Sequence, residues 1–94
     1  MVVVNLRRVV IESVIKIYIA DLVNRGFGSS VTVRFRDVYR VVQEFYRNVD
    51  VNMYEVRNYF VDVMRSYHDC IEDWKKGRVV FNRDCLREKL MALV

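Results

Sequence analysis

The stretch from Asn52 to Arg65 constrains the fold more than any other part of the chain, because it combines a helix start with two contrasting faces. Asn52 can accept a hydrogen bond from a backbone N–H of the first turn, and Glu55 can reach back to the Asn52 N–H. Apolar side chains then recur at helical spacing, at Val56, Phe60, Val63 and Met64. We predict an amphipathic helix over Asn52–Arg65, with these four side chains buried.

The opposite face of this predicted helix carries side chains that can read DNA. It holds Tyr54, Asn58, Val61 and Arg65, with Arg57 at its edge. In a major groove, arginine can bind guanine through two hydrogen bonds, asparagine can pair with the edge of adenine, and a methyl group can contact the methyl group of thymine. Our hypothesis is a DNA recognition helix that the rest of the chain holds in place.

The size and composition indicate one small globular domain. The chain has 94 residues, 53% of them hydrophobic, so we expect a single domain over residues 1–94 with a substantial core. The net charge of +4 favours a polyanionic partner. No apolar run approaches the roughly 18 residues that span a bilayer, and the apolar start is too short for a signal peptide. We therefore expect no membrane partner and a cytoplasmic location, the host cytoplasm if the protein is viral.

A helix and a strand are predicted near the start of the chain. The helix covers Leu6–Arg25 and ends before Gly26, a natural stop. Its expected buried stripe is Ile11, Val14, Ile15, Tyr18 and Leu22. A second apolar line, formed by Leu6, Val10 and Ile17, must meet another element or a second copy of the chain. After a loop, Val31–Phe35 alternates and is rich in β-branched residues, which predicts a strand.

The segment Asp37–Arg47 predicts another helix, with Asp37 able to cap it. Its expected buried stripe is Val38, Val41, Val42 and Phe45. A turn over residues 48–51 then leads into the helix that begins at Asn52.

The residues after Ser66 predict a hairpin and a short helix. Tyr67–Glu72 and Arg78–Asn82 would be the strands, joined by a four-residue tip closed at Gly77, which can take positive φ. From Asp84 to the end, a helix would carry an apolar ridge of Leu86, Leu90 and Leu93.

The predicted order is helix, strand, helix, turn, helix, two-stranded hairpin, helix, which is an α+β fold that is mostly α. It resembles the winged-helix form of the helix-turn-helix family over about the whole chain, with a two-stranded wing and a C-terminal helix. Val31–Phe35 resembles the first strand, Arg36–Arg47 the positioning helix, and Lys75-Lys76-Gly77 the wing tip. The segment Tyr54-Glu55-Val56-Arg57-Asn58-Tyr59-Phe60 is similar to recognition helices of small archaeal and archaeal-virus transcription regulators.

This resemblance implies a sequence-specific regulator that binds double-stranded DNA. The recognition helix would enter a major groove. There Arg57, Asn58 and Arg65 would meet base edges or flanking phosphates, and the Tyr54 hydroxyl would reach a phosphate.

The resemblance also implies contacts outside the recognition helix. Arg36 and Arg40, near the start of the preceding helix, would bind phosphates. Lys75, Lys76 and Arg78 would bring the wing onto the adjacent minor groove or backbone, so that affinity falls with salt.

Two other functions stay open. A winged helix could instead bind protein in a replication or transcription complex, with Tyr54, Val61 and Trp74 as anchors. Trp74 could pack under the hairpin or lie exposed. A structural role, as in a virion, has no sequence signal of its own. The simplest alternative is that Arg57 and its neighbours form an ordinary solvent-exposed helix face that binds no ligand.

No catalytic set, metal site or cofactor motif accompanies the single histidine, His68, so we expect neither an enzyme nor a cofactor. Cys70 and Cys85 are expected to be two buried thiols, with a disulfide as the remaining possibility. A disulfide would suit a hyperthermophile, towards which the many charged residues and the single Gln43 also point.

The leucine ridge of the last helix and the second apolar line of the first could pack on each other within one chain. They could equally form a symmetric seam. We favour a homodimer through the N-terminal and C-terminal helices, because helix-turn-helix proteins often read two half-sites.

Overall fold

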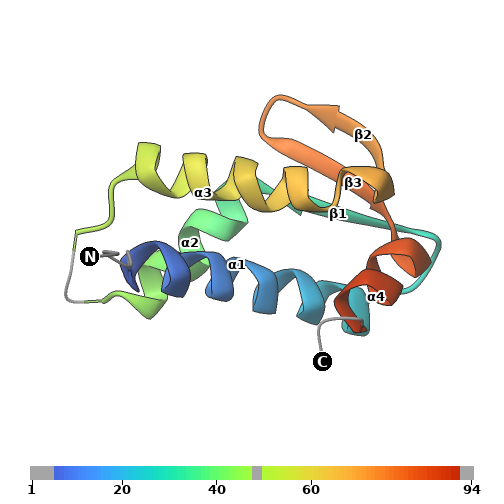
Figure 1. Cartoon of the computed structure of the whole chain (residues 1–94), viewed down its shortest axis with the longest axis horizontal. Helices are drawn as coiled ribbons and strands as arrows, with labels where there is room; N and C mark the ends of the chain where they lie inside the picture. Colours follow the sequence, from blue (N-terminus) through green and yellow to red (C-terminus); the bar gives the residue numbers. More distant parts are fainter. Residues whose placement is uncertain (1–5, 48–49, 92–94) are drawn as a thin grey trace, which may run out of the picture.

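The computed structural model describes residues 6–47 and 50–91 (Figure 1). In chain order its elements are α1 (Leu6–Arg25), β1 (Ser30–Arg34), α2 (Phe35–Phe45), α3 (Met53–Ser66), the 3-10 turn η1 (His68–Cys70), β2 (Ile71–Lys75), β3 (Arg78–Asn82) and α4 (Arg83–Met91). This is an α+β fold that is mostly helical, as predicted. None of the helices in residues 6–47 and 50–91 is both long and apolar enough to cross a bilayer.

Four helices and a small sheet surround one core. In Figure 1, α1 and α3 lie side by side, the β2–β3 hairpin projects beside the C-terminal half of α3, and α4 lies against the end of α1. The sheet is antiparallel with strand order β1-β3-β2. Val31 of β1 lies opposite Phe81 of β3, and Val33 lies opposite Val79. All four of these side chains are buried, so this face of the sheet closes the core.

Helix α1 has the predicted bounds but not the predicted core face. Ile11, Ile15, Ile19 and Val23 are buried. Ile11 and Ile15 were predicted to be buried, whereas Val14, Tyr18 and Leu22 of the predicted stripe are only partly buried and pack at the edge of the core. Because aliphatic residues occur all around this helix, periodicity alone could not select the side that α2 and α3 cover.

Helix α2 begins two residues earlier than predicted, at Phe35, and the strand before it ends at Arg34. Asp37 does not cap it. Arg34 is the N-cap residue and its side chain makes no capping bond, while the Phe35 N–H donates to the Gly77 carbonyl at the hairpin tip, at 3.0 Å. A long-range acceptor therefore replaces the local cap. Val38 and Val42 are buried as predicted, but Phe45 is 61% exposed.

Helix α3 confirms its predicted core face, since Val56, Phe60, Val63 and Met64 are all buried. Asn52 is its N-cap, and its Oδ1 accepts from the N–H groups of Tyr54 at 2.7 Å and Glu55 at 3.4 Å. Glu55 binds Arg7 of α1 with its side chain.

The hairpin differs from the prediction in its first strand. Residues 67–70 are not extended: Tyr67 precedes the turn η1 as its N-cap, and both Tyr67 and Cys70 are buried. Strand β2 instead runs through Trp74 to Lys75, which leaves a tip of only Lys76 and Gly77, with φ +76° at the glycine. A register shift between Ile71 and Asp73 interrupts the pairing of β2 with β3.

A disulfide joins Cys70 to Cys85, so the expectation of two free thiols was wrong. The bond connects η1, at the base of the hairpin, to the first turn of α4. Leu86 of α4 is fully buried within the chain and Leu90 is partly buried. Leu93, and part of the predicted turn at 48–51, lie outside the described residues.

Candidate nucleic-acid interface

The outward face of α3 presents the side chains that the sequence predicted for DNA contact. Tyr54 is 75% exposed, and Arg57, Asn58 and Arg65 are also exposed. Val61 is partly buried and packs against the core. The underside of the helix is held by the buried residues described above, so the orientation of this face is fixed by packing rather than by the exposed groups themselves.

The two carboxylates of α3 point away from this face. Arg7 Nε lies 2.7 Å from Glu55 Oε1, and Arg8 Nη2 lies 3.1 Å from Asp62 Oδ2. The hydrogen bond with Glu55 also raises the pKa of the Arg7 guanidinium. Both acids therefore face α1, where arginines balance their charge, and the outward face keeps its cationic character.

A hollow of about 180 Å³ separates α3 from the β2–β3 hairpin. Its cationic lining is Arg57, Lys75 and Lys76. Its aromatic lining is Phe35, Phe60 and Trp74. Trp74 is 42% exposed, so it is not buried under the hairpin, which was one of the two arrangements considered for it. The hollow thus combines positive charge with flat apolar surface.

Arg57 is positioned by an aromatic ring. Its guanidinium carbon lies 5.8 Å from the centroid of Phe35, a cation–π distance. Phe35 in turn packs edge-on against Phe60, with centroids 5.6 Å apart. The first residue of α2 therefore supports the arginine of α3 at the edge of the hollow.

Three more arginines lie around the junction of α2 with the hairpin. Arg34 is directly opposite Arg78 in the β1–β3 ladder, on the face of the sheet away from the core. Arg36 follows Phe35, whose N–H is bonded to the hairpin tip. Sequence reasoning missed Arg34, although its place in the alternation after Val31 and Val33 predicts an outward side chain.

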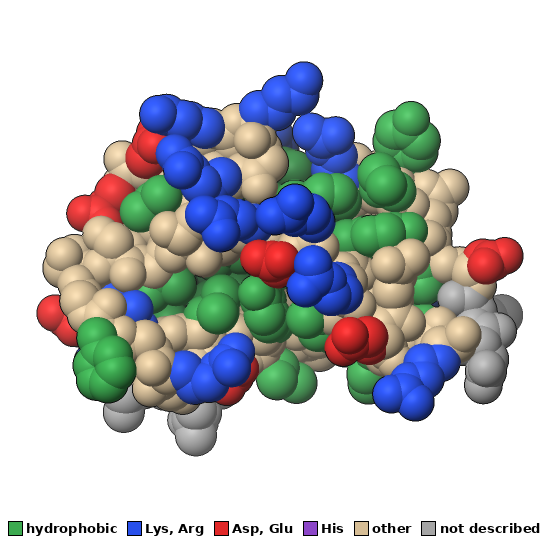
Figure 2. All heavy atoms as spheres, turned by 180° about the vertical axis from the view of Figure 1, so that it is seen from behind, with side chains coloured by type: hydrophobic (Ala, Val, Ile, Leu, Met, Phe, Trp, Pro, Cys, Tyr) green, Lys and Arg blue, Asp and Glu red, His purple; other side chains and the backbone are tan. Residues whose placement is uncertain are grey.

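The charged surface is broad but not uniform. Figure 2, seen from behind Figure 1, shows lysine and arginine side chains gathered over the upper half of that face, with a few acidic groups among them. Asp73 lies 3.9 Å from both Lys75 and Arg78, which weakens but does not cancel their charge. The structure thus brings together Arg36, Arg57, Lys75, Lys76 and Arg78 of the predicted site.

The other predicted residues lie farther from this cluster. Arg40 is one turn along α2 and approaches Asp37 at 3.8 Å. Arg65 is at the far end of α3, roughly 12 Å along the helix axis from Arg57. Tyr54 and Asn58 lie on the N-terminal half of α3. A ligand that touches all nine residues must therefore be extended.

Comparison with protein-family models, with curated proteins and with solved structures found no match to this chain. Within the part of the chain that the structure describes, no group of three or more His, Cys, Asp or Glu side chains could hold a metal ion. Function is therefore inferred from the geometry of α3, the start of α2 and the hairpin.

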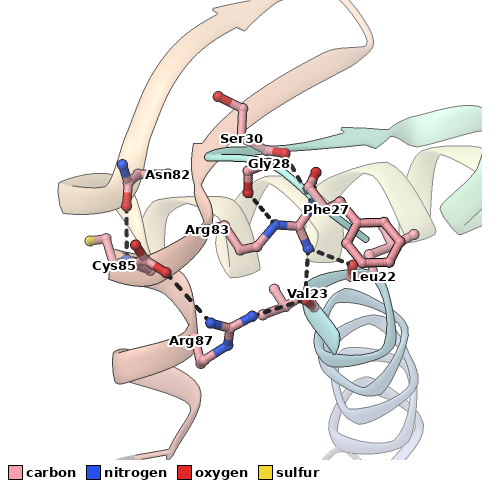
Figure 3. Close-up of polar contacts among 10 residues, drawn as sticks. Leu22, Val23, Phe27, Gly28, Ser30, Asn82, Arg83, Cys85 and Arg87 are labelled. Atoms are coloured by element: carbon pink, nitrogen blue, oxygen red, sulfur yellow. Dashed lines mark hydrogen bonds and ion pairs between the residues drawn. The ribbon is translucent and has the colours of Figure 1, made fainter. Parts of the chain in front are cut away.

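The sheet that carries the hairpin is anchored to α1 by a residue that sequence reasoning missed. Arg83 is only 7% exposed, and its guanidinium donates to five backbone carbonyls at the end of α1, in the loop that follows and at the start of β1 (Figure 3). The acceptors are the carbonyl oxygens of Leu22, Val23, Phe27, Gly28 and Ser30. No local pattern marks this residue, because all of its partners are more than 50 positions away.

We predict that Gly26→Ala lowers the free energy of unfolding by about 1–3 kcal/mol, because an added Cβ would overlap the Arg83 guanidinium. Gly26 has no positive φ, so this close approach is the structural reason for a glycine there. Urea denaturation would measure the loss. In an Arg83→Ala background the same substitution should lose most of its effect, and equal losses in both backgrounds would contradict the explanation.

Proposed function

We propose that this chain is a sequence-specific double-stranded DNA-binding protein, a winged helix-turn-helix transcription regulator rather than an enzyme. In this proposal α2 and α3 are the helix-turn-helix, α3 is the recognition helix, and the β2–β3 hairpin is the wing. The order of elements and the position of the hairpin beside α3 support it.

One observation carries the proposal: the exposed face of α3 is free of carboxylates and borders a lysine-tipped hairpin across a shared hollow. DNA recognition needs base-reading groups on a rigid element and cations beside it for the phosphates. Arg57 and Asn58 supply the first, and Lys75 and Lys76 supply the second. A solvent-exposed face without a ligand would not need Glu55 and Asp62 to be paired with arginines of α1.

We propose a division of labour within this surface. Arg57, Asn58 and Arg65 contact base edges in a major groove, and the Tyr54 hydroxyl contacts a phosphate. Arg36 and Arg40 of α2 bind phosphates, and the hairpin cations Lys75, Lys76 and Arg78 bind the adjacent backbone.

Salt-titrated binding to duplex DNA tests this proposal, with fluorescence anisotropy as the measurement. Log affinity should fall steeply with log salt, and Lys75→Ala/Lys76→Ala should reduce the slope by about 2, roughly one for each lost phosphate contact. On a selected target site, Arg57→Ala/Arg65→Ala should lower affinity by about 10–100-fold and relax the sequence preference.

The matched control is Arg87→Ala/Lys89→Ala, which removes the same charge from α4, away from the hairpin and α3 (Figure 1). It should change affinity and slope much less than the two α3 and hairpin variants do. A salt slope near zero for the wild-type protein, or equal losses for the control and the α3 variant, would reject DNA binding through this face.

A second function has a specific observation in its favour. Trp74 and Tyr54 are 42% and 75% exposed, and large exposed aromatic side chains are typical anchors of protein interfaces. In that case the hollow would receive an apolar side chain of a partner protein, and Arg57 would pair with an acidic group. Weak duplex binding combined with a salt-independent affinity for such a partner would favour this alternative.

A further inference from the structure

The outward face of α1 carries a line of uncharged side chains, and Asp21, which pairs with Arg25 at 2.7 Å, lies beside it. Leu6 and Ile17 are 70% and 69% exposed, on the side opposite the buried line of Ile11, Ile15, Ile19 and Val23. We name this face the α1 stripe: Leu6, Val10, Ser13, Ile17, Ala20 and Asn24. Since 30% of the chain is charged, an uncharged and largely apolar stripe on a 20-residue surface helix calls for a partner.

The spacing within the α1 stripe alternates between four and three residues, which is the heptad spacing of a coiled-coil seam. Val10, Ile17 and Asn24 take the first of the two seam positions, and Leu6, Ser13 and Ala20 take the second. The β-branched Val10 and Ile17 at the first position and the single asparagine are features of parallel two-stranded seams, whereas the second position has one leucine, Leu6.

The polar members of the stripe do not oppose burial. The Ser13 hydroxyl donates to the Val9 carbonyl within the helix at 2.7 Å, so it already has a partner. Ala20 and Ser13 are small and allow two helix backbones to approach closely. Asn24 can pair with its own symmetry copy, which sets the register of such a pair.

The two edges of the α1 stripe carry complementary charges. One edge opens into a groove of about 650 Å³ between α1 and α2, where Phe45 is 61% exposed. Asp21 and Glu44 line this groove together with Arg25. Lys16 lies on the other edge and makes no ion pair within residues 6–47 and 50–91. In a parallel pair, each Lys16 would lie beside Asp21 of the second copy, five positions further along.

We propose that the α1 stripe binds the α1 stripe of a second copy of this chain, in parallel and in register. An antiparallel pair would place the two Lys16 residues on the same edge, away from Asp21 of the second copy. Leu86 takes no part in this seam, because it is buried inside its own chain. The proposal does not depend on DNA binding, since it uses neither α3 nor the hairpin.

Sedimentation equilibrium without DNA tests the seam. The wild-type chain should be a dimer, and Ile17→Glu should weaken dimerisation by at least about tenfold, because it places two carboxylates at the centre of the seam. The matched control is Tyr54→Glu, which puts the same acid at an exposed aromatic position on α3 and should leave the dimer intact. A monomeric wild-type protein, or equal effects of the two variants, would overturn the proposal.

The direction of the helices is tested separately. Lys16→Glu should weaken the dimer about two- to fivefold, the range expected for a surface ion pair, and the exchange Lys16→Glu/Asp21→Lys should recover most of that loss. Ser13→Cys should give a covalent dimer on mild oxidation, since a parallel seam brings the two introduced thiols together. A Ser13→Cys dimer that fails to cross-link would overturn the parallel register. So would weaker dimerisation of Lys16→Glu/Asp21→Lys than of Lys16→Glu alone.

Discussion

Replacing Arg83 by alanine is expected to lower the free energy of unfolding by about 4 kcal/mol, a large share of the stability of a domain of this size. The guanidinium approaches five backbone carbonyls at 2.6–3.2 Å, and the bond to Val23 is buried. A buried carbonyl left without a donor costs about 1–3 kcal/mol, and solvent can reach only some of the five. The positive charge also stabilises the carbonyl end of α1.

Urea denaturation measures this loss, and two variants separate its causes. Arg83→Lys keeps the charge but has only three donors from one nitrogen, so it should recover less than half of the stability. Arg87→Ala is the matched control. Its guanidinium reaches the Val23 carbonyl and Asp84 only at 3.5 Å, and its removal should cost less than about 1 kcal/mol. If Arg83→Ala and Arg87→Ala were equally stable, the carbonyl cluster would not be what anchors the sheet to α1.

Reduction of the Cys70–Cys85 disulfide is expected to cost about 3 kcal/mol. The two cysteines are 15 residues apart, and opening a loop of that length restores about this much chain entropy to the unfolded state. For a domain of this size the loss corresponds to a fall of about 15 °C in the melting temperature. Because the enclosed segment contains the whole β2–β3 hairpin, its protection against hydrogen exchange should fall as well.

The control for this prediction is Cys70→Ala/Cys85→Ala, measured with and without a thiol reductant. Reductant should lower the melting temperature of the wild-type protein towards that of the double variant and leave the variant itself unchanged. An equal melting temperature for the wild-type protein in both conditions would mean that the bond does not form in solution or does not stabilise the fold.

The difference between α3 and α1 shows what a sequence pattern can predict. In α3, Val56, Phe60, Val63 and Met64 recur on one side and the charged residues lie elsewhere, so the buried side follows from spacing, and all four were placed correctly. In α1, apolar residues occur on every side, and the buried face includes Ile19 and Val23, which the predicted stripe did not contain. An amphipathic helix encodes its orientation, whereas a mostly aliphatic one takes its orientation from the elements that pack on it.

The same contrast holds for the candidate site. The exposed face of α3 could be predicted, because the residues that orient it lie within one turn of those that it presents. The hollow beside it could not, since it depends on Phe35, Arg57 and Trp74, which come from three elements. The pairing of Glu55 with Arg7 is likewise a contact over 48 positions that no local spacing reveals.

The sequence by itself determined the order of the helices and strands, the buried side of α3 and the cap at Asn52, because each depends on interactions among residues a few positions apart. Only the tertiary structure decided which cations share a surface and that Cys70 is bonded to Cys85. It also decided that Arg83 donates to the carbonyls at the end of α1 and that the hairpin tip accepts from the first N–H of α2. Those features join residues far apart in the chain, and their partners become neighbours only when the core has formed.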